Sequence, residues 1–174
     1  IGEKPAKKAS TMEAKSKGVV YIDQELSLAD ELWVGENIYL GELPRKSFGR
    51  VDWATLYAKS GDILKRLNCN FTPQTRVGSL SIANKQMVEI ARALTVEAKA
   101  VIFDEPTASL TDAEKVVLFD IINDFRGRGV GVVYISHRMD DIFTISERIS
   151  VLSAGFFLGS LGTADTDAYE VTEL

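Results

Sequence analysis

Two adjacent carboxylates, Asp104 and Glu105, stand directly after an apolar run at 100–103. Such a run is typical of a buried parallel strand, and ligands of open α/β sheets bind just beyond the carboxyl ends of the strands. An aspartate there can hold Mg²⁺, because hard cations take oxygen ligands, and a neighbouring glutamate can orient or deprotonate a water. These two residues alone leave open a second interpretation, in which Asp104 begins a turn and caps the next segment.

Two other apolar runs also end in polar side chains. Residues 18–22 (GVVYI) lead into Gln24, and residues 129–136 (GVGVVYIS) lead into His137, which is the only histidine of the chain. A single histidine at a strand end is more often structural than catalytic, but three polar strand ends are a less ordinary coincidence. We therefore predict that four side chains share one rim of a parallel sheet and face one hollow of triphosphate size: Gln24, Asp104, Glu105 and His137.

The segment between the carboxylate pair and the histidine predicts a crossover helix. Thr111 and Glu114 have the spacing of a capping box, in which each side chain satisfies a backbone donor at a helix start. The apolar residues that follow recur every three or four positions: Leu118, Ile121, Ile122 and Phe125. The helix is predicted to run to about Arg126, where Gly127 and Gly129 suit a C-cap. Strand, helix and strand together predict an α/β fold with a parallel sheet.

Two more helices are predicted upstream. Ser81 is a good N-cap, and an apolar stripe follows it: Met87, Ile90, Ala91 and Leu94. A helix start offers N–H groups and a partial positive charge to a phosphate, although an ordinary capped helix explains Ser81 by itself equally well. Residues 51–68 predict an amphipathic helix with its apolar side chains on one side: Trp53, Leu56, Tyr57, Leu64 and Leu67.

Four motifs, taken together, carry a family resemblance. They are Gln24, the stretch LSIANKQMVEIARAL at 80–94, VIFDEPTASLT at 101–111 and YISHRMDDIF at 134–143. In this order and spacing they resemble the ATP-binding cassette (ABC) ATPases, and most of all the first cassette of monosaccharide importers. The resemblance extends from about residue 18 to about residue 162.

The resemblance implies an architecture and a set of roles. The fold is expected to be a P-loop NTPase-like parallel sheet core at 1–24 and 90–174, with a helical subdomain inserted at 25–89. ATP and Mg²⁺ are the implied cofactors. Gln24 matches the Q-loop glutamine, which contacts the magnesium or the attacking water. Asp104 matches the Walker B aspartate that serves the metal, Glu105 the catalytic glutamate, and His137 the switch histidine that contacts the γ-phosphate.

The signature loop is matched with departures. The residues expected to face ATP held by a partner cassette are Ser81, Ile82, Ala83 and Asn84. Ala83 replaces the usual glycine and Asn84 the usual glutamine, so a methyl group stands where backbone would approach a phosphate. Thr111 replaces the aspartate often found in the D-loop. The sugar importers that this chain resembles tolerate similar substitutions in the signature.

The resemblance also implies partners. A second cassette is expected to complete the nucleotide sites, and transmembrane permease subunits are expected to dock on residues 25–85. Glu36, Asn37 and Ile38 resemble the segment that meets the permease, with a solvated loop as the alternative. A periplasmic sugar-binding protein would act indirectly, and the expected location is the cytoplasmic face of the membrane.

A phosphate-binding loop is missing from the motif set. It needs the pattern G-x-x-x-x-G-K-S/T, which no stretch of the 174 residues fits; the basic cluster at 4–17 is followed only by Gly18. We expect a fragment of a longer cassette that alone binds ATP weakly and does not hydrolyse it measurably. A gap in the sheet and self-association are expected as well.

Composition narrows the function classes. A net charge of −5 and a pI near 5.0 argue against nucleic-acid binding, which needs clustered Lys and Arg. Cys69 is the only cysteine, so an intrachain disulfide is excluded. The apolar stretch from Ile149 to Gly162 is too short for a bilayer crossing and is predicted to form core strands.

Two alternatives remain beside the importer ATPase. A non-hydrolysing scaffold or regulatory module would have no chemical need for Glu105 and His137. A chromosome-maintenance or translation-associated cassette would show a long heptad insertion or a basic face, and the sequence has neither.

Overall fold

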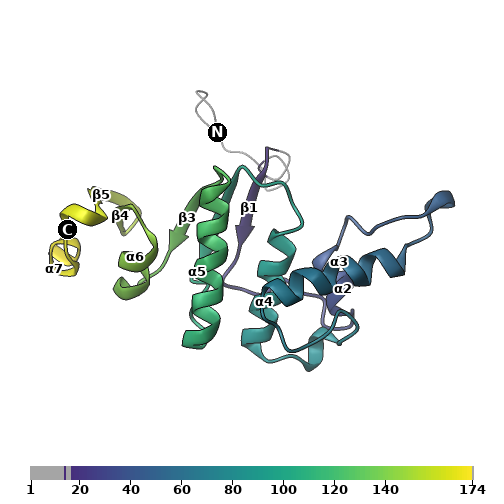
Figure 1. Cartoon of the computed structure of the whole chain (residues 1–174). Coiled ribbons are helices and arrows are strands. Elements are labelled where there is room, and N and C mark those ends of the chain that lie inside the picture. The colour runs from purple at the N-terminus through teal and green to yellow at the C-terminus, as the bar shows by residue number, and fades with distance from the viewer. Residues whose placement is uncertain (1–13, 15–16, 174) are drawn as a thin grey trace. The chain divides into compact units, whose positions relative to one another are not determined.

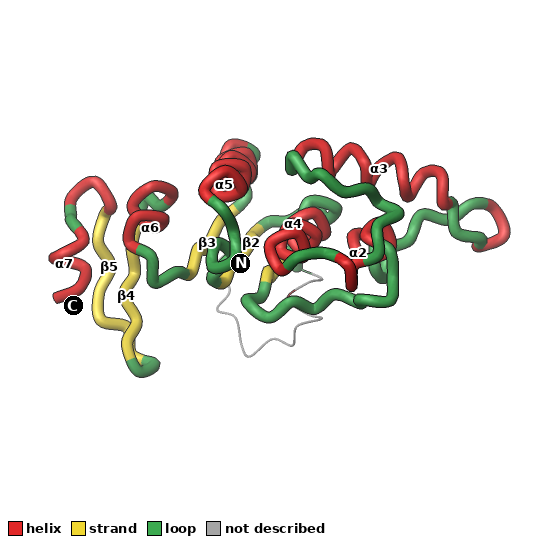
Figure 2. Tube along the Cα trace, turned by 90° about the horizontal axis from the view of Figure 1, so that it is seen from below, coloured by secondary structure: helices red, strands yellow, loops and turns green. Residues whose placement is uncertain are grey.

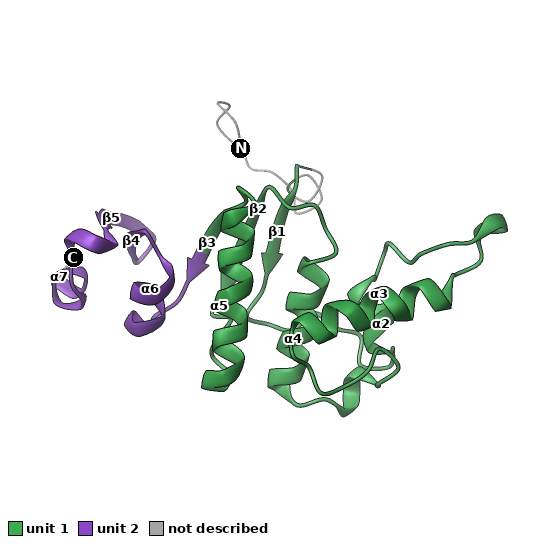
Figure 3. Cartoon of the chain, in the orientation of Figure 1, with its two compact units in different colours: residues 1–133 green, residues 134–174 purple. Residues whose placement is uncertain are grey.

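The computed structural model describes residue 14 and residues 17–173, which divide into two compact units, 1–133 and 134–174 (Figure 3). Each unit is considered by itself. The basic start of the chain at 4–8, and with it most of the predicted core segment 1–24, lies outside the described residues.

The first unit contains a parallel sheet. β1 (Val19–Ile22) pairs with β2 (Ala100–Asp104), with Ile22 opposite Phe103, and the strand order is β1-β2-β3. β3 (Gly131–Ile135) begins in this unit (Figures 1 and 2). Its Gly131 N–H donates to the Lys99 carbonyl at 3.0 Å. These three strands are hydrogen-bonded neighbours. The gap expected from the missing phosphate-loop strand would lie outside them and stays a prediction.

Alternation along β1 and β2 separates a buried face from an open one. Ile22, Val101 and Phe103 are at most 2% exposed, whereas Tyr21 is 47% exposed. Because in-register parallel neighbours share a face, Tyr21 and Asp104 lie on the other side of the sheet from Phe103. The core thus forms on one face, and the polar strand ends lie on the face that stays accessible.

The helices between β1 and β2 form a cluster of their own. α2 (Val34–Ile38) packs on α3 (Trp53–Arg66) and on α4 (Ile82–Ala93), and short 3-10 turns lie at Ser47–Gly49 and Val77–Ser79 (Figure 1). The helices predicted at 51–68 and after Ser81 are confirmed as α3 and α4. The border expected between 89 and 90 falls inside α4, while the assignment of 25–89 to a helical subdomain stays a prediction.

The predicted apolar side of α3 is only partly a core face. Leu56, Leu64 and Leu67 are buried. Trp53 and Tyr57 instead contact Trp33 and each other, with ring centroids 5.9–6.1 Å apart, and Trp53 remains 41% exposed. Edge-to-face and tilted aromatic contacts stabilise such a cluster at the surface.

α5 (Asp112–Gly127) follows the local rules predicted for it. Glu114 N–H donates to Thr111 Oγ1 at 3.4 Å, and Thr111 N–H donates to Glu114 Oε2 at 2.8 Å, which is the capping box. Gly129 has φ 76°, and Val130 N–H returns to the Phe125 carbonyl at 3.0 Å, so the helix ends in a left-handed C-cap. The predicted stripe is buried: Leu118, Ile121, Ile122 and Phe125.

The second unit consists of short elements around a hairpin. α6 (Met139–Ile145) precedes β4 (Arg148–Ser153) and β5 (Phe156–Gly162), which pair antiparallel, and the short turn Thr163–Asp165 and α7 (Ala168–Glu173) follow (Figure 2). Ala154 and Gly155 have φ 48° and 84°, as a two-residue hairpin turn requires. No helix in the described part of the chain is long and apolar enough to cross a bilayer.

The prediction of core strands in this region is wrong in one respect. The strands form, and Ile149 is buried, but three large apolar side chains are 65–72% exposed: Leu152, Phe156 and Phe157. Successive residues of a strand point to opposite faces, so the exposure of both Phe156 and Phe157 means that neither face of the hairpin is covered near its turn by the described residues of this unit.

Candidate functional site

The carboxyl ends of β1 and β2 lie side by side. Ile22 pairs with Phe103 in parallel register, so Asp23 and Asp104, the next residue on each strand, emerge at the same edge. Gln24 follows one position later and is exposed. The structure therefore brings Gln24 and the Asp104–Glu105 pair to one edge of the sheet, which is where open α/β sheets hold ligands.

Tyr21 contacts this edge and has no role in the sequence motifs. Its phenol donates a hydrogen bond to Asp104 Oδ2 at 2.5 Å. That bond, with partial desolvation and the negative charges of Asp104 and Asp23, raises the pKa of Tyr21 to about 12. The phenol thus keeps its proton and fixes the Asp104 carboxylate. The sequence signal that could have indicated Tyr21 is the alternation of side chains along β1, which puts residues 21 and 23 on the same face of the strand.

Glu105 has an unusual backbone. Its φ is 46°, in the left-handed region that non-glycine residues rarely occupy, and the chain turns there because Ala108 N–H donates to its carbonyl at 3.3 Å. The turn is seated by Thr107, which is fully buried. Left-handed non-glycine residues cost about 1–3 kcal/mol and concentrate at functional sites, where surrounding structure holds them.

The segment after Gln24 has no regular secondary structure but is tied down by side chains. Asp23 Oδ1 accepts the Glu25 N–H at 3.0 Å. Farther along, the buried Asn37 accepts the Ala29 N–H at 2.8 Å and donates to the Ala29 carbonyl at 3.1 Å. The resembling segment at 36–38 is thus part of a buried helix rather than a solvated loop.

The signature residues begin α4, away from the edge of the sheet. Ser81 is the N-cap as predicted, and its Oγ accepts the Asn84 N–H at 3.2 Å. Ile82 is 68% exposed at this helix start. The other end of α4 lies by β1, because Ala93 and Val20 line one cavity. With a rise of about 1.5 Å per residue, Ser81 lies about 18 Å from Ala93 along the helix.

His137 belongs to the second unit. It is exposed in the short loop between β3 and α6, where the Arg138 N–H donates to Ser136 Oγ at 3.1 Å. Arg138 also pairs with Asp141 at 3.4 Å at the start of α6. The histidine is therefore presented directly after a strand by a loop with its own hydrogen bonds. A common hollow for His137 and the Asp104 edge stays a prediction.

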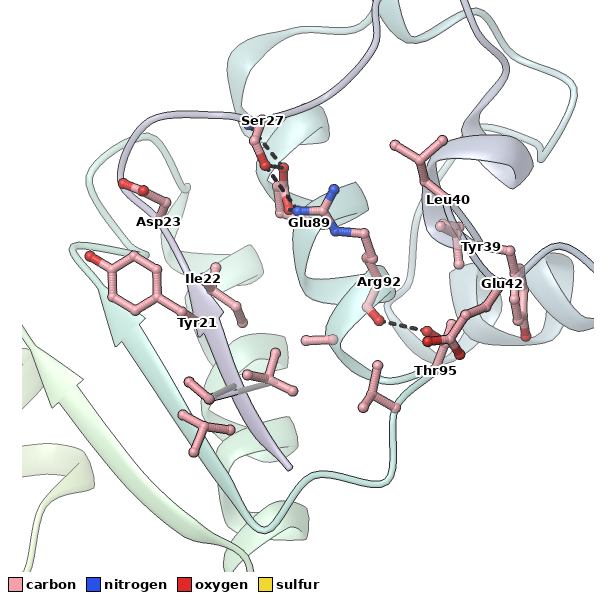
Figure 4. A pocket seen from close by; sticks show the side chains of 16 residues that line it. Tyr21, Ile22, Asp23, Ser27, Tyr39, Leu40, Glu42, Glu89, Arg92 and Thr95 are labelled. Atoms are coloured by element: carbon pink, nitrogen blue, oxygen red, sulfur yellow. Dashed lines mark hydrogen bonds and ion pairs between the residues drawn. The ribbon is translucent and has the colours of Figure 1, made fainter. Parts of the chain in front are cut away.

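A cavity of about 380 Å³ opens along β1 and reaches its carboxyl end, where Ile22 and Asp23 are part of its lining (Figure 4). Its walls come from β1, α4 and the residues around the end of α2. Among the described residues, Asp104 and Glu105 are not part of its lining. The cavity therefore adjoins the carboxylate edge through Tyr21 and Asp23 but does not include the Asp104–Glu105 pair.

The donors at the edge suit a hard cation better than a soft one. Asp104, Asp23 and Gln24 offer carboxylate and amide oxygens, which Mg²⁺ accepts together with several waters. No group of three or more His, Cys, Asp or Glu residues in the described part of the chain forms a ready metal cage. A cation here would depend on water and on a phosphate ligand to fill its coordination.

Comparison with known proteins is consistent across sequence and structure. The family model described as ABC transporter matches residues 1–108. The chain is 44% identical over 175 residues to "Ribose import ATP-binding protein RbsA 2" of Rubrobacter xylanophilus, covering 100% of the chain and 34% of that protein. It is 38% identical over 170 residues to "Putative ribose/galactose/methyl galactoside import ATP-binding protein 2" of Agrobacterium fabrum, covering 98% and 33%. The chain thus spans about a third of these relatives.

Solved structures show the same fold. A dimeric ATP-binding cassette, MJ0796, solved in a post-hydrolysis state with ADP and phosphate, superposes with a TM-score of 0.76 at 21% identity, over 90% of this chain and 68% of that one. The cassette MJ1267 gives a TM-score of 0.72 at 23% identity, over 92% and 69%. At this identity the likeness speaks for the fold alone.

Proposed function

Because the chain belongs to the ABC transporter family, we propose that it is part of the ATP-binding and ATP-hydrolysing subunit of a monosaccharide importer. The observation that carries the proposal is the edge where Gln24, Asp104 and Glu105 emerge together from β1 and β2. The names of the relatives, which refer to import of ribose and galactose, support the class of substrate.

Each residue at the edge has one task in the proposed reaction. Asp104, fixed by Tyr21, and Gln24 would hold Mg²⁺, which when bound would neutralise charge on the terminal phosphates of ATP. Glu105 orients the attacking water and accepts its proton. His137, which belongs to the second unit, would donate a hydrogen bond to the γ-phosphate and help to stabilise charge during phosphoryl transfer.

A second cassette completes the proposed site. Ser81, Ile82, Ala83 and Asn84 would contact ATP held by that cassette, because a capped helix start presents backbone N–H groups and a partial positive charge. These four residues are at the end of α4 that lies away from β1. This position fits contact with ATP bound to a partner cassette better than contact with ATP at the chain's own Asp104 edge. The methyl group of Ala83 would keep the phosphate slightly farther from the backbone than glycine does.

The proposal also assigns a surface for the membrane partner. In the proposal, residues 1–24 and 90–174 form the ATPase core, and residues 25–89 form the subdomain that meets transmembrane permease subunits. The protein would work at the cytoplasmic face of the membrane, with a periplasmic sugar-binding protein acting through the permease. Nucleic acid is not a proposed partner, because the chain is acidic overall.

The proposal is tested on the full-length protein that carries this sequence. Glu105→Gln removes the proton acceptor at nearly constant shape, and His137→Ala removes the γ-phosphate contact; each is expected to lower kcat by about 100- to 1,000-fold. Glu97→Gln is the control, because Glu97 is exposed in the same unit. ATPase activity unchanged in Glu105→Gln, or absent from the wild type, would overturn the proposal in favour of a scaffold.

The 174-residue chain on its own offers a complementary test. It contains no G-x-x-x-x-G-K-S/T stretch, so the main backbone and lysine contacts to the triphosphate are not among its residues. Calorimetric titration with MgATP is expected to show weak binding and no turnover. Tight, magnesium-dependent binding would contradict this expectation.

A further inference from the structure

One charged side chain lies in the interior of the first unit outside the carboxylate edge. Glu89 is 4% exposed in the middle of α4, inside a run of six buried residues at 86–91. A carboxylate in such surroundings is costly unless it is paired and hydrogen-bonded. Its partners therefore identify what the residue does.

Both carboxylate oxygens of Glu89 have partners (Figure 4). Oε1 accepts the Ser27 N–H at 3.0 Å and a hydrogen bond from Ser27 Oγ at 3.1 Å. Oε2 lies 2.6 Å from Arg92 Nη2, and that same guanidinium donates to Ser27 Oγ at 3.0 Å. Glu89, Arg92 and Ser27 thus form a closed triangle, which we name the Ser27 latch.

The latch does more than complete the helix. Glu89 and Arg92 are three residues apart on α4 and can pair without help from any other segment. The two bonds to Ser27, in contrast, connect the helix to the irregular segment that begins at Gln24. Side chains of α2 and α4 hold this segment at three residues: Glu89 holds Ser27, Asn37 holds Ala29 and Lys85 holds Asp30. Ser27 is the one of these three that lies nearest to Gln24 in the sequence.

The surroundings of the latch leave it room to open. Ser27, Glu89 and Arg92 all line the cavity of about 380 Å³ beside β1. Releasing Ser27 on that side does not require a packed apolar core to separate. The same helix carries Ser81 to Asn84 at its start, so a shift of α4 along or about its axis moves the latch with it.

From this geometry we propose that Glu89 is a positioning residue, which holds Ser27 against α4 and thereby fixes where Gln24 stands during ATP hydrolysis. The inference rests on the proposed function for its kinetic consequence, but not for the latch itself. Glu89 has no contact with substrate in this scheme and acts through Ser27 and the two residues between Ser27 and Gln24.

The latch itself is tested by hydrogen exchange without nucleotide, in the full-length protein. Glu89→Gln keeps the size of the side chain but weakens its hold on the Ser27 amide, and the exchange rate of that amide is expected to rise about 10-fold. Asp62→Asn, an exposed change on α3, is the control and should leave the amide as it is. An unchanged Ser27 amide in Glu89→Gln would overturn the latch.

The positioning role is tested by steady-state ATPase kinetics on the same variants and on Ser27→Ala. Ser27→Ala leaves the Glu89–Arg92 pair in place, so it provides the test if Glu89→Gln folds poorly. We expect kcat for ATP to fall about 10-fold with KM changed less than about twofold, because displacement of a positioning group costs rate rather than binding. The double variant should be no worse than the poorer single variant. If Glu89→Gln and Ser27→Ala both have the wild-type kcat and the wild-type Tm, Glu89 has no positioning role. A wild type without ATPase activity would instead refute the proposed function, while hydrogen exchange still decides the latch.

Discussion

The two units of the chain differ in where their large apolar side chains lie. In the first unit Phe103 and Phe125 are at most 2% exposed, on a strand and a helix that follow each other in sequence. In the second unit Phe156 and Phe157 are 65–72% exposed on a hairpin. The first unit exposes Phe48 and Ile82 as well, but most of the buried apolar side chains of the described residues belong to it. The two units therefore differ in the size of their buried core.

The comparison shows where the proposed site gets its rigidity. The carboxylate edge lies at the end of strands whose other face is buried, so close packing of that face holds the backbone of the edge residues in place. His137 stands in a unit whose buried apolar side chains are few among the described residues: Ile145, Ile149 and Val171. The largest effects on stability should accordingly come from substitutions in the first unit.

The largest expected effect is that of Phe103→Ala. The side chain is fully buried directly beside Asp104, and its truncation removes contacts and leaves a cavity, at a cost of about 3–5 kcal/mol in the free energy of unfolding. Urea denaturation followed by circular dichroism measures the change. A loss below about 1 kcal/mol would remove the difference between the units on which the comparison depends.

Asn37→Ala is expected to have the next largest effect. The amide of Asn37 is fully buried and serves both the N–H and the carbonyl of Ala29, so its removal leaves backbone groups without these partners at a cost of about 2–3 kcal/mol. The same denaturation experiment measures it, with Asn70→Ala, an exposed asparagine of the same unit, as the control. Equal effects of the two substitutions would mean that the buried amide contributes nothing special.

Elements set by local rules were predictable from sequence. The apolar run before Asp104, the capping box of Thr111 and the glycine at 129 each act within a few residues, and the structure has the strand, the helix and its end where these signals place them. The shared edge of Gln24 and Asp104 was predictable too, because parallel strands end on one side.

Contacts between distant side chains were not predictable in the same way. Tyr21 and Asp104 are 83 positions apart, and Ser27 and Glu89 are 62 apart, so no local pattern links them. The exposure of Phe156 also escaped prediction, because apolar composition gives no information on what covers a strand. Long-range pairing and burial depend on the whole fold, which a motif does not contain.

A smaller effect, present below pH 10 and lost at high pH, is expected from Tyr21→Phe. The pKa of Tyr21 is raised from 10.0 to about 12, mainly by its hydrogen bond to Asp104. Because the folded pKa lies above the unfolded one, the stabilisation by this bond is fully present below pH 10 and is lost as pH rises toward 12.

Absorbance at 295 nm during alkaline titration measures this ionisation. The wild type should show a late step near pH 12 that Tyr21→Phe lacks. Tyr169→Phe, in the second unit, leaves the Tyr21–Asp104 pair intact and should retain that step. A tyrosine at position 21 that titrates near its ordinary pKa would show that its phenol is not bound to Asp104 in solution.

The smallest effect on stability is expected from Phe156→Ala. The ring is 72% exposed, so its truncation exchanges little buried area and should change the free energy of unfolding by less than about 0.5 kcal/mol. Removing an exposed apolar ring should also reduce self-association, which light scattering at rising protein concentration measures. A loss of stability near that of Phe103→Ala would mean that the hairpin of the second unit is packed as tightly in solution as the sheet of the first, and the contrast between the two units would disappear.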